Sequence, residues 1–145
     1  LRENGKQLIT AGEVAKAGFP TFNGWVVNTK FGAENRAGVV NFLKVMNEVN
    51  GQYTKNKAAW TADSPQIKAI AANVGSTPQD AVVALDGASY PDGEAQMSTA
   101  WMGGGAAATM KTTADFLKGA GRINAVADNY AKFVNADFAK TAAGK

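Results

Sequence analysis

The sequence predicts an α/β chain that is mostly α-helical and carries one or two short strands. Residues 21–28 are rich in aromatic and β-branched side chains, which favours a strand with Trp25 and Val27 on one face and Val26 on the other. Much of the remaining chain repeats apolar residues at helical spacing. A lone strand can satisfy neither its backbone groups nor its two apolar faces. We therefore expect this strand to be central and buried, with neighbours supplied from outside the chain.

The N-terminal residues predict a second short strand and one helical turn. Residues 6–10 read as the strand, and residues 11–17 can form a helix that stops at Gly18. Pro20 then prevents the helix from continuing. The chain begins at Leu1 without an initiator Met, and we expect it to be the later part of a longer protein.

The middle of the chain predicts one long helix and then two short ones. The long helix should span about residues 33–53 and bury one stripe, which consists of Val39, Phe42, Leu43, Met46, Val49 and Tyr53. Ser64 followed by Pro65 opens a helix that ends at Gly75. Thr77 is the predicted N-cap of the next helix, which should stop near Gly87.

The C-terminal part predicts an irregular region and two further helices. Periodicity is lost over residues 88–105, where glycine is frequent. The next helix places Ala107, Met110, Ala114 and Leu117 on one face. The last helix is predicted to begin at Asp128 and to bury four side chains, those of Tyr130, Phe133, Val134 and Phe138.

Composition excludes several classes of protein. The 145 residues are 46% hydrophobic and 19% charged, which is typical of a globular protein. The net charge of +3 is scattered without runs of one sign, so no nucleic-acid partner is predicted. No apolar stretch approaches the roughly 18 residues of a membrane span. Without Cys, the chain has neither disulfides nor thiolate metal sites.

Catalysis is not predicted, because the chain also lacks His, the usual base near neutral pH. Acidic residues cluster in sequence at Asp80, Asp86, Asp92 and Glu94, but all fall where helix caps and loops normally carry carboxylates. We predict no catalytic residue, no metal site and no cofactor.

Two features of the irregular region are candidates for ligand binding. Glycines 103–105 precede a helix and either form a hinge or turn or offer free N–H groups to a small anion. Trp101 is a candidate for lining a pocket, with core packing as the alternative. Trp25 and Trp60 are interpreted as packing residues.

Several motifs in order along the chain resemble a known family. They are Gly5-Lys6-Gln7-Leu8-Ile9-Thr10, Gly18-Phe19-Pro20-Thr21-Phe22, Trp25-Val26-Val27, Lys30-Phe31, Trp60, Ser64-Pro65-Gln66-Ile67, Gln96, Trp101, Thr113-Ala114-Asp115-Phe116-Leu117-Lys118, Gly121-Arg122-Ile123 and Ala125-Val126-Ala127-Asp128-Asn129-Tyr130. Together they resemble the second half of the substrate-binding proteins of ABC importers for taurine, alkylsulfonates and nitrate.

The resemblance implies the C-terminal part of a two-lobe periplasmic-binding-protein fold of type II. Residues 1–10 would end the second lobe, residues 11–20 would form a hinge crossing with Gly18 and Pro20 as hinge residues, and residues 21–145 would complete the first lobe. A small sulfonate or amino-sulfonate such as taurine would be captured by lobe closure, without chemistry. The implied partners are an ABC permease at the inner membrane and the missing N-terminal half of the same protein.

The ligand-binding residues implied by the resemblance are Thr21, Phe22 and Asn23, with Trp101 as a further candidate. Similar proteins place an Asp where this chain has Asn23. An amide lacks the charge that would stabilise an ammonium group, so another sulfonate is an alternative to taurine; equally, Asn23 caps the strand entrance.

The implied location is the periplasm after signal-peptide removal, or a lipid-anchored extracellular position in a Gram-positive source. The same residues leave two other functions as alternatives. One is an enzyme of this fold, similar to thiamine-pyrimidine synthases, which the absence of His disfavours. The other is a free-standing helical interaction domain, which would leave the predicted strand at Trp25 without neighbours.

Overall fold

The computed structural model describes residues 5–144. Leu1, where the given sequence begins, lies outside the described residues. Within the described range every regular element is a helix. The α-helices are α1 (Ala11–Lys16), α2 (Thr29–Glu34), α3 (Arg36–Lys55), α4 (Pro65–Val74), α5 (Pro78–Asp86), α6 (Gly105–Gly119) and α7 (Asp137–Ala142), and the short 3₁₀ helices are η1 (Lys57–Ala59), η2 (Ala95–Met97) and η3 (Ala131–Phe133).

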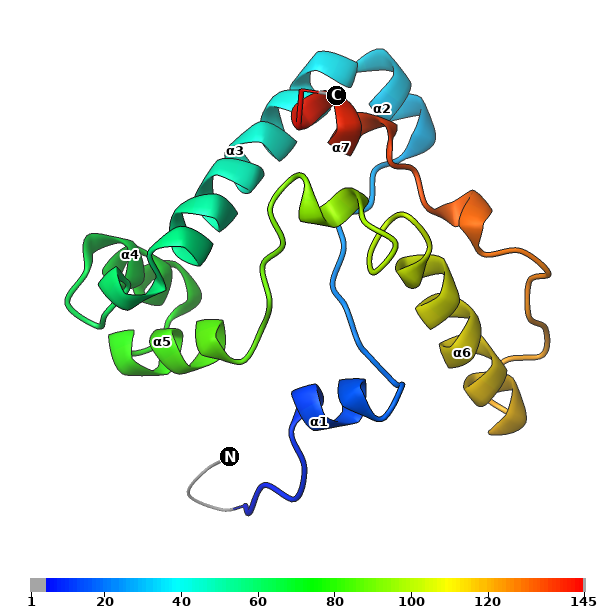
Figure 1. Cartoon of the computed structure of the whole chain (residues 1–145), viewed down its shortest axis with the longest axis horizontal. Helices are drawn as coiled ribbons and strands as arrows, with labels where there is room; N and C mark the ends of the chain where they lie inside the picture. The colour runs from blue at the N-terminus through cyan, green and yellow to red at the C-terminus, as the bar shows by residue number, and fades with distance from the viewer. Residues whose placement is uncertain (1–4, 145) are drawn as a thin grey trace.

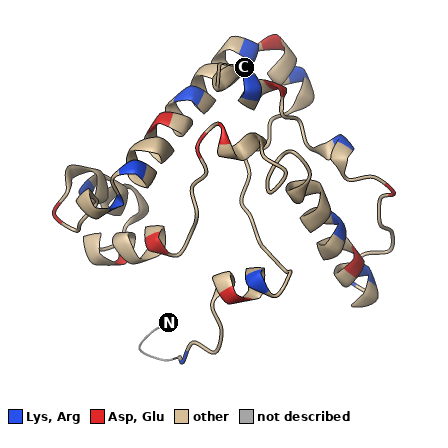
Figure 2. Cartoon of the chain, in the orientation of Figure 1, with Lys and Arg blue, Asp and Glu red and all other residues tan. Residues whose placement is uncertain are grey.

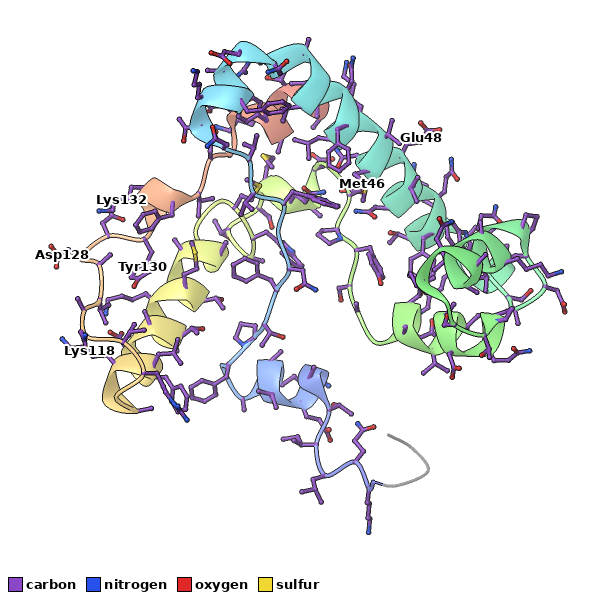
Figure 3. All side chains as sticks on the ribbon, turned by 180° about the vertical axis from the view of Figure 1, so that it is seen from behind. Met46, Glu48, Lys118, Asp128, Tyr130 and Lys132 are labelled. Carbon is purple, nitrogen blue, oxygen red and sulfur yellow. The ribbon has the colours of Figure 1, made fainter. Side chains whose placement is uncertain are left out.

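Helix α3 is the spine of the molecule. It carries α2 and α7 at one end and α4 and α5 at the other, whereas α1 and α6 lie apart from it, so the chain forms an open arch (Figure 1). At the α7 end, the Arg36 guanidinium donates a hydrogen bond to Thr141 Oγ1 over 3.1 Å and lies 5.0 Å from the centre of the Phe138 ring. Figure 3 shows Met46 on the inner side of the arch and Glu48 on its outer side.

The hydrophobic core lies at the α4–α5 end of the spine. The Tyr53 ring contacts Trp60 and Tyr90 edge-to-face, with ring centres 5.2 and 5.3 Å apart. Ile67 is fully buried beside these rings, and Ala71 and Ala81 complete the cluster. Apolar burial of this kind is the main stabilising contribution available to a chain without disulfides.

The helix boundaries predicted around this core are confirmed. Ser64 Oγ accepts a hydrogen bond from the backbone N–H of Ile67 over 3.3 Å, and Thr77 Oγ1 accepts one from the N–H of Asp80 over 3.1 Å. Gly75 ends α4 in the left-handed conformation, with a φ of 68°. These caps satisfy N–H groups that a helix start otherwise leaves without partners.

Two predicted helices have different limits in the structure. The long helix begins at Arg36 because Asn35, with a φ of −121°, separates it from α2. The helix predicted from Asp128 is replaced by η3 and the later α7. Asn129 Oδ1 accepts from Ala131 N–H over 2.8 Å and Asn135 Oδ1 accepts from Asp137 N–H over 2.9 Å. Such local turns compete with a continuous helix. Phe133, predicted to be buried, is 60% exposed.

The two predicted strands are not formed among the described residues. Residues 6–10 and 21–28 are irregular, and only Thr10 and Asn28 at their ends form helix caps. The expectation of a central, buried strand is therefore wrong for this chain. Leu8 and Val26 are 92% and 96% exposed. A strand exists only by pairing with another, and no described segment of this chain lies beside residues 21–28 as a partner strand.

Candidate ligand-binding groove

The predicted ligand-binding region lies against α6. A hollow of about 380 Å³ is bounded by Pro20, Thr21 and Phe22 on one side and by α6 on the other. Ile123 and Tyr130, from the connection that follows α6, complete its wall. Figure 3 shows Tyr130 beside this helix. The hollow is open to solvent, so it is a groove rather than an enclosed cavity.

The floor of the groove is the apolar face of α6. Met110, Ala114 and Leu117 recur at helical spacing and line the groove, as the sequence predicts for this face. Ala114 is buried, with 7% of its surface exposed. The groove forms where Pro20, Thr21 and Phe22, which follow the end of α1, lie along this face.

The polar groups of the groove are hydroxyls. Thr21, Thr109, Thr113 and Tyr130 contribute them, and none of the described residues that line the groove is charged. Tyr130 Oη accepts a hydrogen bond from the N–H of Ala127 over 3.3 Å, which leaves its own proton free to be donated. Lys and Arg are spread over the chain rather than gathered at the groove (Figure 2). The groove therefore offers hydrogen-bond donors and apolar contact without a charge of its own.

The structure brings together two of the four ligand-binding residues named from the sequence. Thr21 and Phe22 line the groove, whereas Asn23 and Trp101 are not among the described lining residues. Pro20, named as a hinge residue, also lines it. Sequence reasoning missed Thr109, Thr113 and Tyr130. The two threonines could have been found from their spacing of four residues beside the apolar face of α6.

Gly18 has a local structural role in addition to its predicted place in a hinge. Its φ is 96°, in the region that favours glycine. Its N–H donates to the carbonyl of Ala15 over 3.0 Å, and the N–H of Phe19 donates to Val14 over 3.1 Å. This pair of bonds is a Schellman motif, and it ends α1.

The glycines before α6 form a compact turn, so the turn alternative is confirmed. The N–H groups of Gly103 and Gly105 donate to the carbonyls of Ser98 and Thr99 over 2.9 and 2.8 Å. Gly104 donates to Trp101 over 3.2 Å. Because these N–H groups already have backbone acceptors, the glycines do not form an anion cradle.

Two of the clustered acidic residues act locally. Asp92 Oδ1 accepts from the N–H groups of Glu94 and Ala95 over 3.1 and 2.9 Å. Asp80 accepts from the Thr77 hydroxyl over 2.7 Å. Within residues 5–144, no group of acidic side chains is arranged to hold a metal ion.

A second hollow, of about 480 Å³, lies between η1 and α5. Trp60 and Val82 form its apolar wall, and Lys57 and Asp86 lie at its edge, with Lys57 Nζ 3.0 Å from Asp86 Oδ1. The hydrogen bond that Asp86 accepts from Lys57, followed by the one that it accepts from Tyr53, holds the pKa of Asp86 below its usual range. Burial and the bond to Asp86 raise the pKa of Tyr53. Since the charges pair with each other, this hollow is a weaker candidate than the groove.

Comparison with known proteins gives one informative similarity. The chain is 29% identical over 138 residues to the taurine-binding periplasmic protein of Escherichia coli strain K12, covering 95% of the chain and 42% of that relative. The chain thus spans less than half of the relative's length. No family model and no solved structure matches the chain. In residues 5–144, none of the helices has the length and apolar character needed to cross a bilayer.

Proposed function

We propose that this chain is the C-terminal part of the substrate-binding component of an ABC importer, and that the whole protein captures taurine or a related small sulfonate. The observation that carries the proposal is the similarity to a taurine-binding periplasmic protein, which extends over 95% of the chain. A relationship spread over so many residues is more specific than any single motif.

The groove beside α6 has chemistry that suits part of such a ligand. Sulfonate oxygens are hydrogen-bond acceptors, and the hydroxyls of Thr21, Thr113 and Tyr130 can donate to them. The short alkyl part of the ligand would contact Phe22 and Met110. The groove has no charged lining residue among those described, so charged groups for the ligand would come from the part of the protein outside this chain.

Asn23 and Trp101 are the remaining proposed ligand contacts. Neither is among the described residues that line the groove, so they would contact a part of the ligand that extends beyond it. Residues 11–20 would be the crossing between lobes, with Gly18 and Pro20 at its hinge. Ligand bridging both lobes would favour the closed form, because only that form makes both sets of contacts.

The remaining parts of the proposal concern location and partners. The protein would act in the periplasm, or as a lipid-anchored extracellular protein, and would deliver its ligand to an ABC permease. It would carry out no reaction on the ligand.

Calorimetry on the complete protein tests this function. Taurine, ethanesulfonate and nitrate are titrated separately, and each solute is analysed afterwards for chemical change. We expect saturable heat with a sulfonate and recovery of unchanged solute. Conversion of the solute to a product would overturn the proposal, as would the absence of heat with all three solutes.

Changing Asn23→Asp tests the ligand class. A carboxylate at this position should tighten taurine binding, because it adds a charge opposite the ammonium group. Ethanesulfonate has no ammonium group and is the control ligand, for which binding should not tighten. Equal effects on both ligands would remove Asn23 from the proposed site.

A further inference from the structure

Asn23 is followed by Gly24 in an irregular part of the chain between α1 and α2. Both residues are exposed. Among residues 5–144, neither the side-chain amide of Asn23 nor the backbone N–H of Gly24 forms a hydrogen bond with another described group. No contact therefore holds the Asn23 side chain away from the peptide nitrogen that follows it.

The surroundings of Gly24 leave room for these two groups to meet. Outside its chain neighbours, a Cβ at Gly24 would have a single atom within 4 Å, Phe22 Cε2 at 3.9 Å. Glycine also has more backbone freedom than any other residue. The nitrogen of Gly24 can therefore reach the side-chain carbonyl of Asn23 without displacing another part of the chain.

The same dipeptide occurs at Asn50 and Gly51 in a different environment. Both residues lie within α3 and are half-buried. Inside an α-helix each N–H donates to the carbonyl four positions earlier, so the Gly51 nitrogen is held in the helix. A reaction at that nitrogen requires local opening of α3, whereas the irregular backbone at Gly24 requires none. Asn50 is therefore a matched comparison within the same chain.

We propose that Asn23 is a site of spontaneous deamidation, at which the chain converts its own side-chain amide into a carboxylate. The Gly24 nitrogen attacks Asn23 Cγ and loses its proton to water, while the Cγ–Nδ2 bond breaks and ammonia leaves. Water then opens the cyclic imide. Cleavage between Cγ and the Gly24 nitrogen yields aspartate, and cleavage between the backbone carbonyl carbon and that nitrogen yields isoaspartate. The net reaction consumes one water molecule and releases one ammonia, with no change in oxidation state.

The product supplies a charge that the groove beside α6 lacks. Thr21 and Phe22, which precede Asn23, line the groove, and none of its described lining residues is charged. Each conversion lowers the formal net charge of +3 by one. The aspartate form should favour a ligand with an ammonium group, because a carboxylate makes a charge-assisted hydrogen bond to it. This consequence rests on the proposed function, whereas the reaction rests only on the surroundings of Asn23 and Gly24.

Incubation of the complete protein tests the reaction. Samples are held at pH 6 and at pH 8, and tryptic peptides are followed by mass spectrometry. Cleavage after Lys places residues 17–30 and 45–55 in separate peptides. We expect conversion at Asn23 to be at least about tenfold faster than at Asn50, because α3 must open first. It should be faster at pH 8, since the attack needs the Gly24 nitrogen to lose its proton.

Fragmentation of the first peptide separates Asn23 from Asn28. The Oδ1 atom of Asn28 already accepts a hydrogen bond from the N–H of Phe31 over 3.1 Å, so Asn28 should stay unchanged. Gly24→Ala is the matched variant, because its Cβ fits the open space at this position. It should slow conversion of Asn23 about tenfold by restricting the approach of the nitrogen. Gly51→Ala is the control and should leave the rate at Asn23 unchanged.

Ligand binding is measured on the aspartate form after its separation by ion exchange. Taurine should bind about tenfold more tightly than to the amide form, and ethanesulfonate should not. Conversion at Asn23 that is no faster than at Asn50 overturns the proposal, as does equal conversion in G24A and the unchanged protein. Conversion that leaves taurine affinity unchanged supports the deamidation site and contradicts the proposed ligand contact of Asn23.

Discussion

Tyr53 Oη lies 3.1 Å from Asp86 Oδ1 and donates a hydrogen bond to it, which joins the last turns of α3 to the end of α5. Lys57 Nζ lies 3.0 Å from the same oxygen. Both charged side chains are about half exposed, at 53% for Lys57 and 52% for Asp86. The contacts of Asp86 with Tyr53 and Lys57 therefore lie at the side of the core where the rings of Trp60 and Tyr53 meet.

Asp86→Asn should reduce the dependence of stability on acid pH. The Lys57 and Tyr53 hydrogen bonds lower the pKa of the folded carboxyl, so its contribution is fully present above the ordinary Asp pKa of about 3.9. That contribution is lost as the pH falls through the lowered folded value. Urea unfolding between pH 6 and pH 2 should therefore give a shallower decline in the free energy of unfolding for D86N.

The control for this measurement is Asp63→Asn. Asp63 lies 3.9 Å from Lys68, and its side chain is 99% exposed. D63N should keep the acid dependence of the unchanged chain. Glu13 also has a lowered pKa, because of its bonds to Thr10, so D86N should retain part of the decline. Identical curves for D86N and the unchanged chain would show that the Asp86 contacts do not contribute.

Ile67→Ala should destabilise the chain by about 2–5 kcal/mol, since Ile67 is fully buried and its neighbours can close the cavity only in part. Ile67→Val should cost about 0.5–1.5 kcal/mol. Val74→Ala, on the same helix but 66% exposed, is the control and should stay within about 0.5 kcal/mol. Urea denaturation followed by circular dichroism gives all three values. Equal losses for I67A and V74A would place the core elsewhere.

Gly103→Ala and Gly51→Ala should change stability in opposite directions. A Cβ at Gly103 would lie 2.7 Å from Ser98 O and 2.8 Å from Met97 O, so the turn before α6 must shift, at a cost of about 1–3 kcal/mol. A Cβ at Gly51, within α3, meets nothing within 4 Å. Alanine there should stabilise the helix by about 0.5–1 kcal/mol. Thermal unfolding measures the stability of both variants. If G103A were as stable as the unchanged chain, the turn before α6 would not be close-packed.

Thr113→Val should weaken sulfonate binding by the complete protein about five- to tenfold, because one neutral hydrogen bond contributes about 1 kcal/mol. Thr113 lines the groove, and valine keeps its shape without the hydroxyl. Thr112→Val changes the neighbouring hydroxyl, which does not line the groove, and should leave affinity within about twofold. Titration calorimetry measures both. Equal affinities for T113V and T112V would place the ligand away from α6.

The sequence predicts correctly the helices whose starts are set by capping residues close by in the sequence. Ser64 and Thr77 cap helices through bonds to residues three positions along, so their effect is visible in a short stretch of sequence. The break near Asn129 was missed, because its side chain competes for backbone groups in a way that apolar spacing does not reveal.

The irregular segments were harder to predict for a different reason. The strand expected at Trp25 depends on hydrogen bonds to residues distant in sequence or absent from the chain. In the groove, Thr21 and Phe22 were identified, but the contributions of Thr113 and Tyr130 follow from the position of α6, which no local motif specifies.

Helix α1 is fixed at both of its ends. Thr10 and Glu13 form reciprocal bonds at its start, with the Thr10 N–H 2.7 Å from a Glu13 carboxylate oxygen, and the bonds of Gly18 and Phe19 close its end. The helix held by these bonds spans about 9 Å, at 1.5 Å per residue over its six residues. If the chain before Thr10 turns relative to the chain after Pro20, as the proposed hinge requires, the rotation would fall at the residues that flank α1 rather than within it.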